Sequence, residues 1–207
     1  MNLFSERKIL IATHNLGKLE EFKSILGDLN LKIISSKDLN LAEPDEIADT
    51  FLGNARIKSR TSSQESNLPC LADDSGLEVH ALGNQPGVYS ADWAETEHGR
   101  DFKKAMEHLW NKLILTKKEK PFNAHFSCTL VLTFPDGKEQ VFRGKVAGEI
   151  VWPMRGIEGH GYDPIFLPKG YNKTFAEMSS KKKNSISHRN IALQKFKSFF
   201  YKNIPDN

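Results

Sequence analysis

A short segment at residues 8–12, in which four consecutive apolar residues follow Lys8, constrains the fold of this chain more than any other feature. Such a run is typical of a strand that is buried on both faces, and a strand of this kind needs cover on both sides of its sheet. A polar segment follows at residues 13–17, and apolar residues then recur at helical spacing across residues 18–27. The beginning of the chain therefore predicts a strand, a loop and a helix.

Further apolar segments continue this alternation. Residues 31–35 and 68–72 predict two more strands, and a helix that starts near Asp49 or Thr50 is expected between them. A last helix is predicted over residues 189–201, where apolar side chains again recur at helical spacing. Strands that alternate with helices in this way are typical of an α/β protein.

The second half of the chain adds a long hairpin to this pattern. Asp101 is the predicted N-cap of an amphipathic helix, and apolar residues alternate over residues 124–134. The turn sequence Pro-Asp-Gly at residues 135–137 leads into a second strand at about 138–151. We therefore expect an α/β fold with a mixed central sheet flanked by helices, in which residues 1–207 form one domain with a second lobe around the hairpin.

Composition excludes several classes of protein. The 207 residues are 39% hydrophobic and 27% charged, as in an ordinary globular protein, and the net charge of +3 is too small to indicate a protein that wraps duplex nucleic acid. The two cysteines, Cys70 and Cys128, have neither disulfide-framework nor zinc-site spacing. No apolar run approaches the roughly 20 residues of a membrane span, and a signal-peptide core is absent. We expect a soluble cytoplasmic protein with no membrane or nucleic-acid partner.

Two adjacent carboxylates, Asp73 and Asp74, followed by Ser75 and Gly76, come directly after the predicted strand at residues 68–72. Neighbouring carboxylates are costly to hold together unless a cation or a substrate requires them, so this segment predicts a metal-assisted catalytic site. The alternative is a strand that ends in an acidic turn. An acidic cluster further upstream could add a second carboxylate to a bound Mg²⁺ or could only begin a helix; it consists of Glu43, Asp45 and Glu46.

Residues 13–18 combine a hydroxyl, an amide and a lysine where a helix begins, and the helix dipole favours an anion there. A phosphate chain could bind this loop, although a purely structural turn is the alternative. Asn54 and Lys58 lie four residues apart and so share one face of their predicted helix. Lys58 could face the same phosphates or could be a solvated surface lysine.

Two later segments carry donor-rich side chains. Residues 159–164 place glycines around an aromatic residue and an acid, which lets a planar ligand approach the backbone closely; a plain turn is the alternative. Lys183, His188 and Arg189 lie at the start of the last helix, where Arg offers a rigid fork for carbonyl oxygens and His can donate or accept. A solvated basic stretch is the alternative for residues 181–183.

Six segments occur together and in order: THNLGK, PDEIADTFLGNA, LADDSG, PGVYSA, GHGYDPIF and KNSISHR. With these segments the chain resembles the inosine triphosphate pyrophosphatase family from about Lys8 to Phe199. The resemblance implies a Mg²⁺-dependent enzyme and a homodimer. It also implies hydrolysis of non-standard purine triphosphates such as dITP, ITP and XTP to the monophosphate and pyrophosphate.

The same resemblance implies a role for each matching residue. Asp74 corresponds to the catalytic base and a Mg²⁺ ligand, Asp73 supports it, and Lys18 and Lys58 face the phosphates. Glu46 corresponds to the second metal-associated acid, with Asp45 as the alternative register. The implied substrate contacts are Thr13, His14, Asn15, Leu16, Gly17, Lys18, Asn54, Ser75, His160, Gly161, Tyr162, Asp163, Lys183, His188 and Arg189.

Two residues depart from the family pattern. His14 replaces the usual glycine of the phosphate loop, and His160 replaces the usual phenylalanine that stacks on the base, which puts base affinity in question. Three other functions are kept open. They are a related pyrophosphatase for other modified nucleotides, a nucleic-acid-binding module that uses residues 181–183, Arg189 and exposed aromatic residues, and a catalytically silent dimeric scaffold, which only His14 and His160 suggest.

Overall fold

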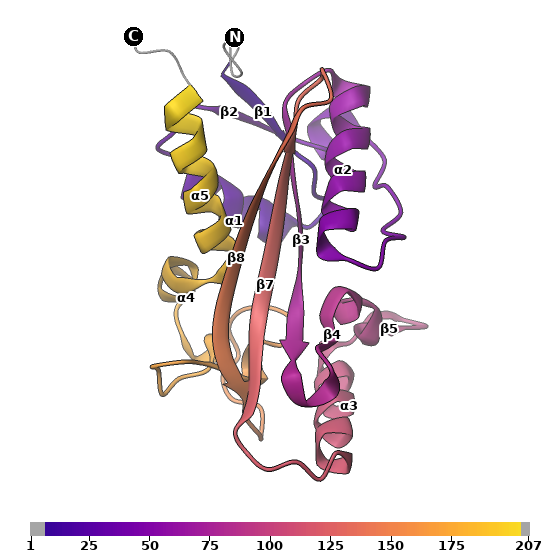
Figure 1. Cartoon of the computed structure of the whole chain (residues 1–207), viewed down its shortest axis with the longest axis vertical. Coiled ribbons are helices and arrows are strands. Elements are labelled where there is room, and N and C mark those ends of the chain that lie inside the picture. The colour runs from indigo at the N-terminus through magenta and orange to yellow at the C-terminus, as the bar shows by residue number, and fades with distance from the viewer. Residues whose placement is uncertain (1–6, 204–207) are drawn as a thin grey trace. The chain divides into compact units, whose positions relative to one another are not determined.

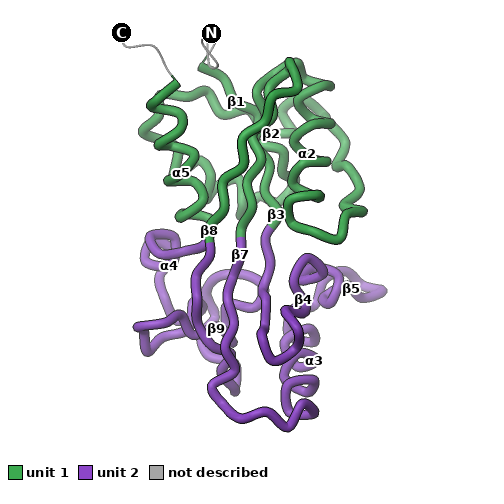
Figure 2. Tube along the Cα trace, viewed as in Figure 1, with its two compact units in different colours: residues 1–74, 128–144, 189–207 green, residues 75–127, 145–188 purple. Residues whose placement is uncertain are grey.

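The computed structural model describes residues 7–203 (Figure 1). These residues form two compact units (Figure 2). Within the described range, unit 1 comprises the chain up to Asp74, the segment Cys128–Gly144 and the chain from Arg189 onward. Unit 2 comprises Ser75–Ser127 and Lys145–His188.

Unit 1 is built on the strand order β2-β1-β3-β7-β8. Strand β1 (Lys8–Ile11) lies between β2 (Lys32–Ser35) and β3 (Cys70–Val79) and pairs in parallel with both. The helices of this unit are α1 (Leu16–Leu26), α2 (Phe51–Ser66) and α5 (His188–Asn203).

Helices α1 and α5 bury their apolar residues in one core of unit 1. Phe22 of α1 and Phe196 of α5 are fully buried there with Ile9 and Leu71 of the sheet. The buried side of α2 is mostly polar instead, and consists of Asn54, Ala55, Lys58, Ser59, Ser62 and Ser63. The Ser59 hydroxyl, for example, lies 2.7 Å from the Thr133 hydroxyl, which satisfies both groups away from water.

Unit 2 contains the second half of β3, which pairs in antiparallel fashion with β4 (Gln85–Pro86). It also contains parts of β7 (Phe122–Thr133) and β8 (Glu139–Ile150), and β8 pairs with β9 (Phe166–Pro168). The other elements of this unit are β5 (Glu95–Thr96), β6 (Gly99–Arg100), α3 (Phe102–Leu115) and α4 (Ser180–Ile186). Short 3₁₀ turns occur at Lys37–Leu39, His80–Leu82, Gly87–Ser90, Asp92–Ala94, Asp163–Ile165 and Phe175–Glu177.

The predicted α/β fold with a mixed sheet is confirmed, since parallel and antiparallel pairs occur in the sheet and helices flank it. The predicted helix starts agree closely with the observed caps. Asn15, Thr50 and Asp101 each accept a backbone N–H from three residues further on. The hairpin of β7 and β8 contributes residues to both units, and the prediction of one domain with two lobes stays a prediction.

Strand β3 is longer than predicted, and this corrects the placement of the acidic pair. The strand does not end at Ala72 but continues through Asp73 and Asp74 to Val79. Asp and Gly are depleted in strands, and Asp, Ser and Gly favour turns, so the sequence indicated a turn here. The strand persists because ion pairs and hydrogen bonds from other segments satisfy the two carboxylates. Helix α4, a single short element, was also not predicted.

Across residues 7–203, no helix combines the length and the apolar composition needed to cross a bilayer.

Glu139 of β8 ties α2 to the sheet of unit 1. Its carboxylate accepts from Arg56 Nη2 at 2.6 Å and from Arg60 Nη2 at 2.9 Å. We expect Glu139→Gln to lower the free energy of unfolding at neutral pH by about 1 kcal/mol, because it removes a charge-assisted, forked pair that is partly screened by water. Urea titration measures this loss.

The loss should depend on pH. The hydrogen bonds from Arg56 hold the pKa of the Glu139 carboxyl below its usual range. A lowered pKa stabilises the fold above the ordinary glutamate pKa, and this stabilisation disappears as the pH falls through the lowered value. The two proteins should therefore converge in acid. Glu97→Gln is the control, because Glu97 is exposed and residues 7–203 show no side-chain partner for it. This variant should leave the free energy of unfolding unchanged at neutral and at acid pH. If Glu139→Gln lowered the free energy of unfolding equally at neutral and at acid pH, the stabilising role of the Glu139 charge would be contradicted.

Candidate active site

The Asp73 carboxylate is held by two cations in unit 1. Lys18 Nζ of α1 lies 3.2 Å from Asp73 Oδ1 and 3.1 Å from Oδ2. Arg189 of α5 reaches Oδ2 from Nη2 at 3.3 Å and from Nε at 3.4 Å. Asp73 is only 1% exposed, so these contacts replace the water that a charged carboxylate needs. The structure thus brings together three of the predicted site residues.

Glu21 is a residue of this cluster that the sequence analysis did not single out. Its carboxylate accepts a hydrogen bond from Arg189 Nη1, so the guanidinium lies between two acids. Burial lowers the pKa of Arg189, but the charges of Asp73 and Glu21 outweigh burial and raise it overall. Glu21 follows Lys18 by three residues, and this spacing places both residues on one face of α1. The spacing is the sequence pattern from which Glu21 could have been predicted as part of the site.

The Asp74 carboxylate has a different environment. Successive residues of a strand point to opposite faces of the sheet, and the Asp74 side chain points toward α2. Asn54 Nδ2 donates to Asp74 Oδ2 at 3.3 Å, and the Asn54 amide is oriented because its Oδ1 accepts from Ala48 N at 2.8 Å. Burial raises the pKa of Asp74 to about 7, against the opposing charge of Lys58. A carboxyl with such a pKa can accept a proton at neutral pH.

Lys58 is buried beside these acids, which excludes the alternative of a solvated surface lysine. Its Nζ donates to Glu46 Oε1 at 2.6 Å. Burial lowers the pKa of Lys58, but Asp73, Asp74 and Glu46 outweigh burial and keep the pKa above its usual range. Asp45, the alternative to Glu46, is exposed, and residues 7–203 offer no side-chain partner to it. Of the two acids, Glu46 is thus the one connected to the cluster.

The predicted phosphate loop forms a capped helix start. Thr13 Oγ1 accepts from Asn15 N at 3.2 Å, and Asn15 Oδ1 accepts from Lys18 N at 3.0 Å. Leu16 and Gly17 begin the first turn of α1. This capping fixes the loop and leaves the Lys18 side chain directed at Asp73.

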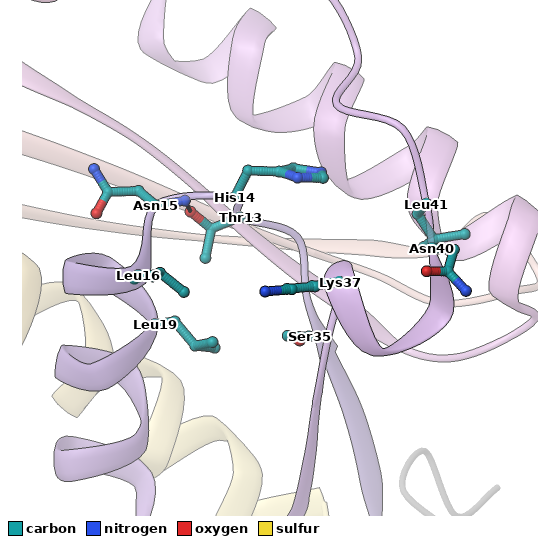
Figure 3. A pocket seen from close by; sticks show the side chains of 9 residues that line it. All are labelled: Thr13, His14, Asn15, Leu16, Leu19, Ser35, Lys37, Asn40 and Leu41. Carbon is teal, nitrogen blue, oxygen red and sulfur yellow. Dashed lines mark hydrogen bonds between the residues drawn. The ribbon is translucent and has the colours of Figure 1, made fainter.

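A cavity of about 300 Å³ adjoins this loop within unit 1 (Figure 3). Its walls come from the loop, from the first turn of α1, from the end of β2 and from the segment that follows β2. The lining residues are Thr13, His14, Asn15, Leu16, Leu19, Ser35, Lys37, Asn40 and Leu41.

In unit 2, Asp163 anchors the residues that were predicted to bind the purine. Lys183 Nζ donates to Asp163 Oδ2 at 2.5 Å, and the backbone N of His160 donates to the same oxygen at 2.7 Å. Burial raises the pKa of Asp163 although the Lys183 charge opposes the change. Gly159 has φ +79°, and a Cβ there would lie 2.1 Å from Asp163 Oδ2, so this turn requires glycine.

His188 and Tyr162 are both buried in unit 2. The His188 ring stacks on Phe126 with the centroids 4.9 Å apart and the planes 12° apart. Tyr162 lies in the core, and its hydroxyl donates to the backbone oxygen of Ser90 at 3.0 Å. A direct contact of Tyr162 with substrate stays a prediction. The other two residues predicted to contact substrate in this unit, both half-buried, are Ser75 and Gly161.

A second polar cluster in unit 2 was not predicted. Glu78 Oε2 lies 2.7 Å from His125 Nε2 and 3.5 Å from Lys145 Nζ, and it accepts from the Ser127 hydroxyl. His80 Nε2 lies 3.0 Å from His125 Nδ1. Both ring nitrogens of His125 are therefore engaged. Between residues 7 and 203, no group of three or more His, Cys, Asp or Glu side chains is placed to hold a metal ion.

The fold and these contacts define the class of protein to which the chain belongs. Two buried acids on a strand, surrounded by lysine, arginine and amide donors from the neighbouring helices, are an arrangement that α/β proteins can use to bind phosphorylated ligands. Comparison with known proteins gives a more specific result. The model of the Ham1 family matches residues 9–199, and the chain belongs to this family.

Relatives and solved structures agree with this assignment. A Ruegeria pomeroyi protein named dITP/XTP pyrophosphatase is 50% identical over 193 residues, which cover 93% of this chain and 95% of that protein. A Rhizobium meliloti protein of the same name is 45% identical over 207 residues, with 95% and 97% covered. The solved structure of a HAM1 protein from Coxiella burnetii has a TM-score of 0.88 and 32% identity, and the match covers 94% of this chain and 98% of that one. The predicted family resemblance is thereby confirmed.

Proposed function

We propose that this chain hydrolyses non-standard purine nucleoside triphosphates such as dITP, ITP and XTP to the monophosphate and pyrophosphate, and so clears them from the nucleotide pool. Extensive identity to relatives named dITP/XTP pyrophosphatase supports the reaction and the substrate class. The observation that carries the proposal is the cluster in unit 1. A buried Asp74 lies among Asn54, Lys58 and Asp73, with the Lys18 ammonium on Asp73.

The donor set of this cluster fits Mg²⁺. The ion prefers oxygen ligands and takes one or two protein carboxylates together with phosphate oxygens and water, so a site need not contain three protein acids. Asp74 and Glu46 would hold it, with Glu46 preferred to Asp45 because only Glu46 contacts Lys58. When bound, Mg²⁺ would neutralise charge on the phosphate oxygens.

The residues of this cluster have separate roles in the proposed hydrolysis. Asp74 accepts a proton from the water that attacks the α-phosphorus, while Asn54 keeps its carboxylate oriented. Lys18 and Lys58 stabilise the negative charge that develops on the phosphate oxygens as pyrophosphate leaves. Asp73, held by two cations, supports Asp74 by keeping Lys18 in place.

Selection of the base is assigned to Lys183, His188 and Arg189. Each can donate a hydrogen bond to a 6-oxo group, whereas the 6-amino group of adenine would present donors to donors. Asp163 fixes Lys183 and the Phe126 ring fixes His188, so neither donor must be ordered during binding. Arg189 uses three of its five N–H groups on Asp73 and Glu21, and a base contact would use the others.

A panel of triphosphates assayed for pyrophosphate release tests the function. We expect turnover of dITP, ITP and XTP in the presence of Mg²⁺. EDTA should abolish this turnover, and an excess of added Mg²⁺ should restore it. Discrimination against dATP should be roughly tenfold to hundredfold for each unpaired polar group. Preferred turnover of modified pyrimidine or methylated nucleotides would instead indicate the related pyrophosphatase. Salt-sensitive nucleic-acid binding without any turnover would indicate the binding module.

The homodimer implied by the family resemblance and the cytoplasmic location expected from the composition belong to the same proposal. Light scattering on the purified protein measures the first, and fractionation of cells measures the second. A monomer that is fully active would contradict the proposed dimer and leave the proposed reaction intact.

A further inference from the structure

The histidine cluster of unit 2 lies outside the residues assigned to hydrolysis. Strands β3, β7 and β8 are consecutive neighbours in the sheet. Glu78 and His80 lie two residues apart at the end of β3 and the start of the turn after it, and His125 and Ser127 lie two residues apart on β7. Side chains at this spacing along extended backbone point to the same face of a sheet, so the two pairs meet between neighbouring strands.

The two histidines turn one ring nitrogen each toward the other. His80 Nε2 lies 3.0 Å from His125 Nδ1. Two imidazole nitrogens this close either share one proton or bind one metal ion. Nitrogen atoms that bind the same ion at about 2.0–2.1 Å are about 2.9 Å apart at a right angle and about 3.4 Å apart in a tetrahedron. The observed separation lies between these values, so a small rotation of the rings would admit an ion in place of the proton.

Glu78 determines which nitrogen of His125 is available. Its Oε2 lies 2.7 Å from His125 Nε2, so the Nε2–H donates to the carboxylate and Nδ1 keeps its lone pair. Histidines that bind metals usually donate their other N–H to a carboxylate in this way, which orients the ring and raises its basicity. The same Glu78 oxygen also accepts from the Ser127 hydroxyl.

The cation of this cluster lies beside the other nitrogen of His125. Lys145 Nζ is 3.0 Å from His125 Nε2 and 3.5 Å from Glu78 Oε2, so its charge is paired with the carboxylate and lies beside Nε2 rather than Nδ1. His80 is exposed and His125 is half-buried, so water can reach the position between the rings. An ion bound there would complete its coordination with water molecules.

We propose that His80 Nε2 and His125 Nδ1 bind a late divalent transition-metal ion such as Zn²⁺, Ni²⁺ or Cu²⁺, with Glu78 as the positioning residue of His125. Imidazole suits these ions, whereas Mg²⁺ prefers oxygen ligands. On binding, the His80 proton moves from Nε2 to Nδ1 through solvent, and the ion takes its place between the rings. The ion would join the turn after β3 to β7 within unit 2. This site uses none of the residues assigned to Mg²⁺, and the inference does not depend on the proposed hydrolysis.

Calorimetric titration of Ni²⁺ into the full chain at about pH 8 tests the site, because protons do not compete for imidazole nitrogens at this pH. The protein is first freed of metal with EDTA and then dialysed into excess Mg²⁺, which occupies sites made of oxygen ligands. We expect one equivalent of Ni²⁺ to bind. Glu78→Gln should weaken this binding about tenfold, the usual effect of losing an orienting carboxylate. His80→Gln and His125→Gln, which each remove a ligand, should weaken it at least as much.

His98→Gln is the matched control for the two histidine variants. His98 is an exposed histidine of the same unit, in the turn between β5 and β6, and its replacement should leave the affinity for Ni²⁺ unchanged. Because His80 is exposed, His80→Gln should fold normally and keeps the test decisive if His125→Gln does not fold.

Electron paramagnetic resonance of one bound equivalent of Cu²⁺ gives a second readout. The spectrum should show coupling to two imidazole nitrogens in the wild type and to one in His80→Gln. An unchanged spectrum in that variant would contradict the assignment of His80 as a ligand.

Three calorimetric results would overturn the inference. They are a wild type that binds no Ni²⁺, equal affinity in the wild type, His80→Gln and His125→Gln, and an equal loss of affinity in His98→Gln. Failure of the proposed function is a separate result. A protein that binds Ni²⁺ through both histidines but releases no pyrophosphate from any triphosphate would retain the metal site and refute only the reaction.

Discussion

Replacing Asp74 with Asn is expected to lower kcat for pyrophosphate release from dITP by about 10²–10⁴-fold, the usual contribution of a positioned general base. The amide has the same shape as the carboxylate but cannot accept a proton from the attacking water. The variant should still fold, because Asp74 is only 5% exposed and the substitution removes a buried charge without leaving a cavity. Steady-state kinetics with coupled detection of pyrophosphate measures the effect.

Asp49→Asn provides the matched control for this variant. Asp49 precedes the N-cap of α2, is exposed and has no side-chain partner within residues 7–203. The same chemical change there should alter kcat by less than a factor of about two, as expected for a surface position. An Asp74→Asn protein with near-normal, Mg²⁺-dependent activity would show that Asp74 is not the base.

Removal of the Arg189 side chain is expected to destabilise the protein by about 3–5 kcal/mol at neutral pH. Arg189 is 8% exposed and pairs with Asp73 and Glu21. Arg189→Ala removes this cation from both Glu21 and Asp73. Arg100→Ala is the control, because the exposed ion pair with Glu95 should contribute no more than about 1 kcal/mol. Urea unfolding compares the two, and an equally small loss for both would contradict the prediction.

A conservative variant separates the stabilising role of Arg189 from base selection. Arg189→Lys keeps the charge but loses the rigid fork of N–H donors. We expect the ratio of kcat/KM for dITP to that for dATP to fall about tenfold, since the 6-oxo group loses a donor. A merely structural role would lower both values equally and leave the ratio unchanged.

Much of the candidate site could be predicted from local sequence. The Asp73-Asp74 pair, the phosphate loop and Lys58 were identified because their residue types and spacing are unusual, and the order of six motifs indicated the family. Glu21 was missed because a glutamate on an exposed helix face is ordinary in a sequence. Its partner Arg189 lies 168 residues further along the chain, and no local pattern links them.

The sequence by itself determined the four long helices α1, α2, α3 and α5, the mixed sheet and the family. Caps such as Asp101 and the spacing of apolar side chains act over a few residues, so they can be read without the fold. Tertiary structure alone decided that Asp73 and Asp74 lie inside a strand and face different partners. That strand survives its two carboxylates because Lys18 and Arg189 lie 55 and 116 residues from Asp73 in the sequence, yet reach it in the fold. The energy of interaction between two charges depends on the distance between them in the folded protein, and local sequence does not specify that distance.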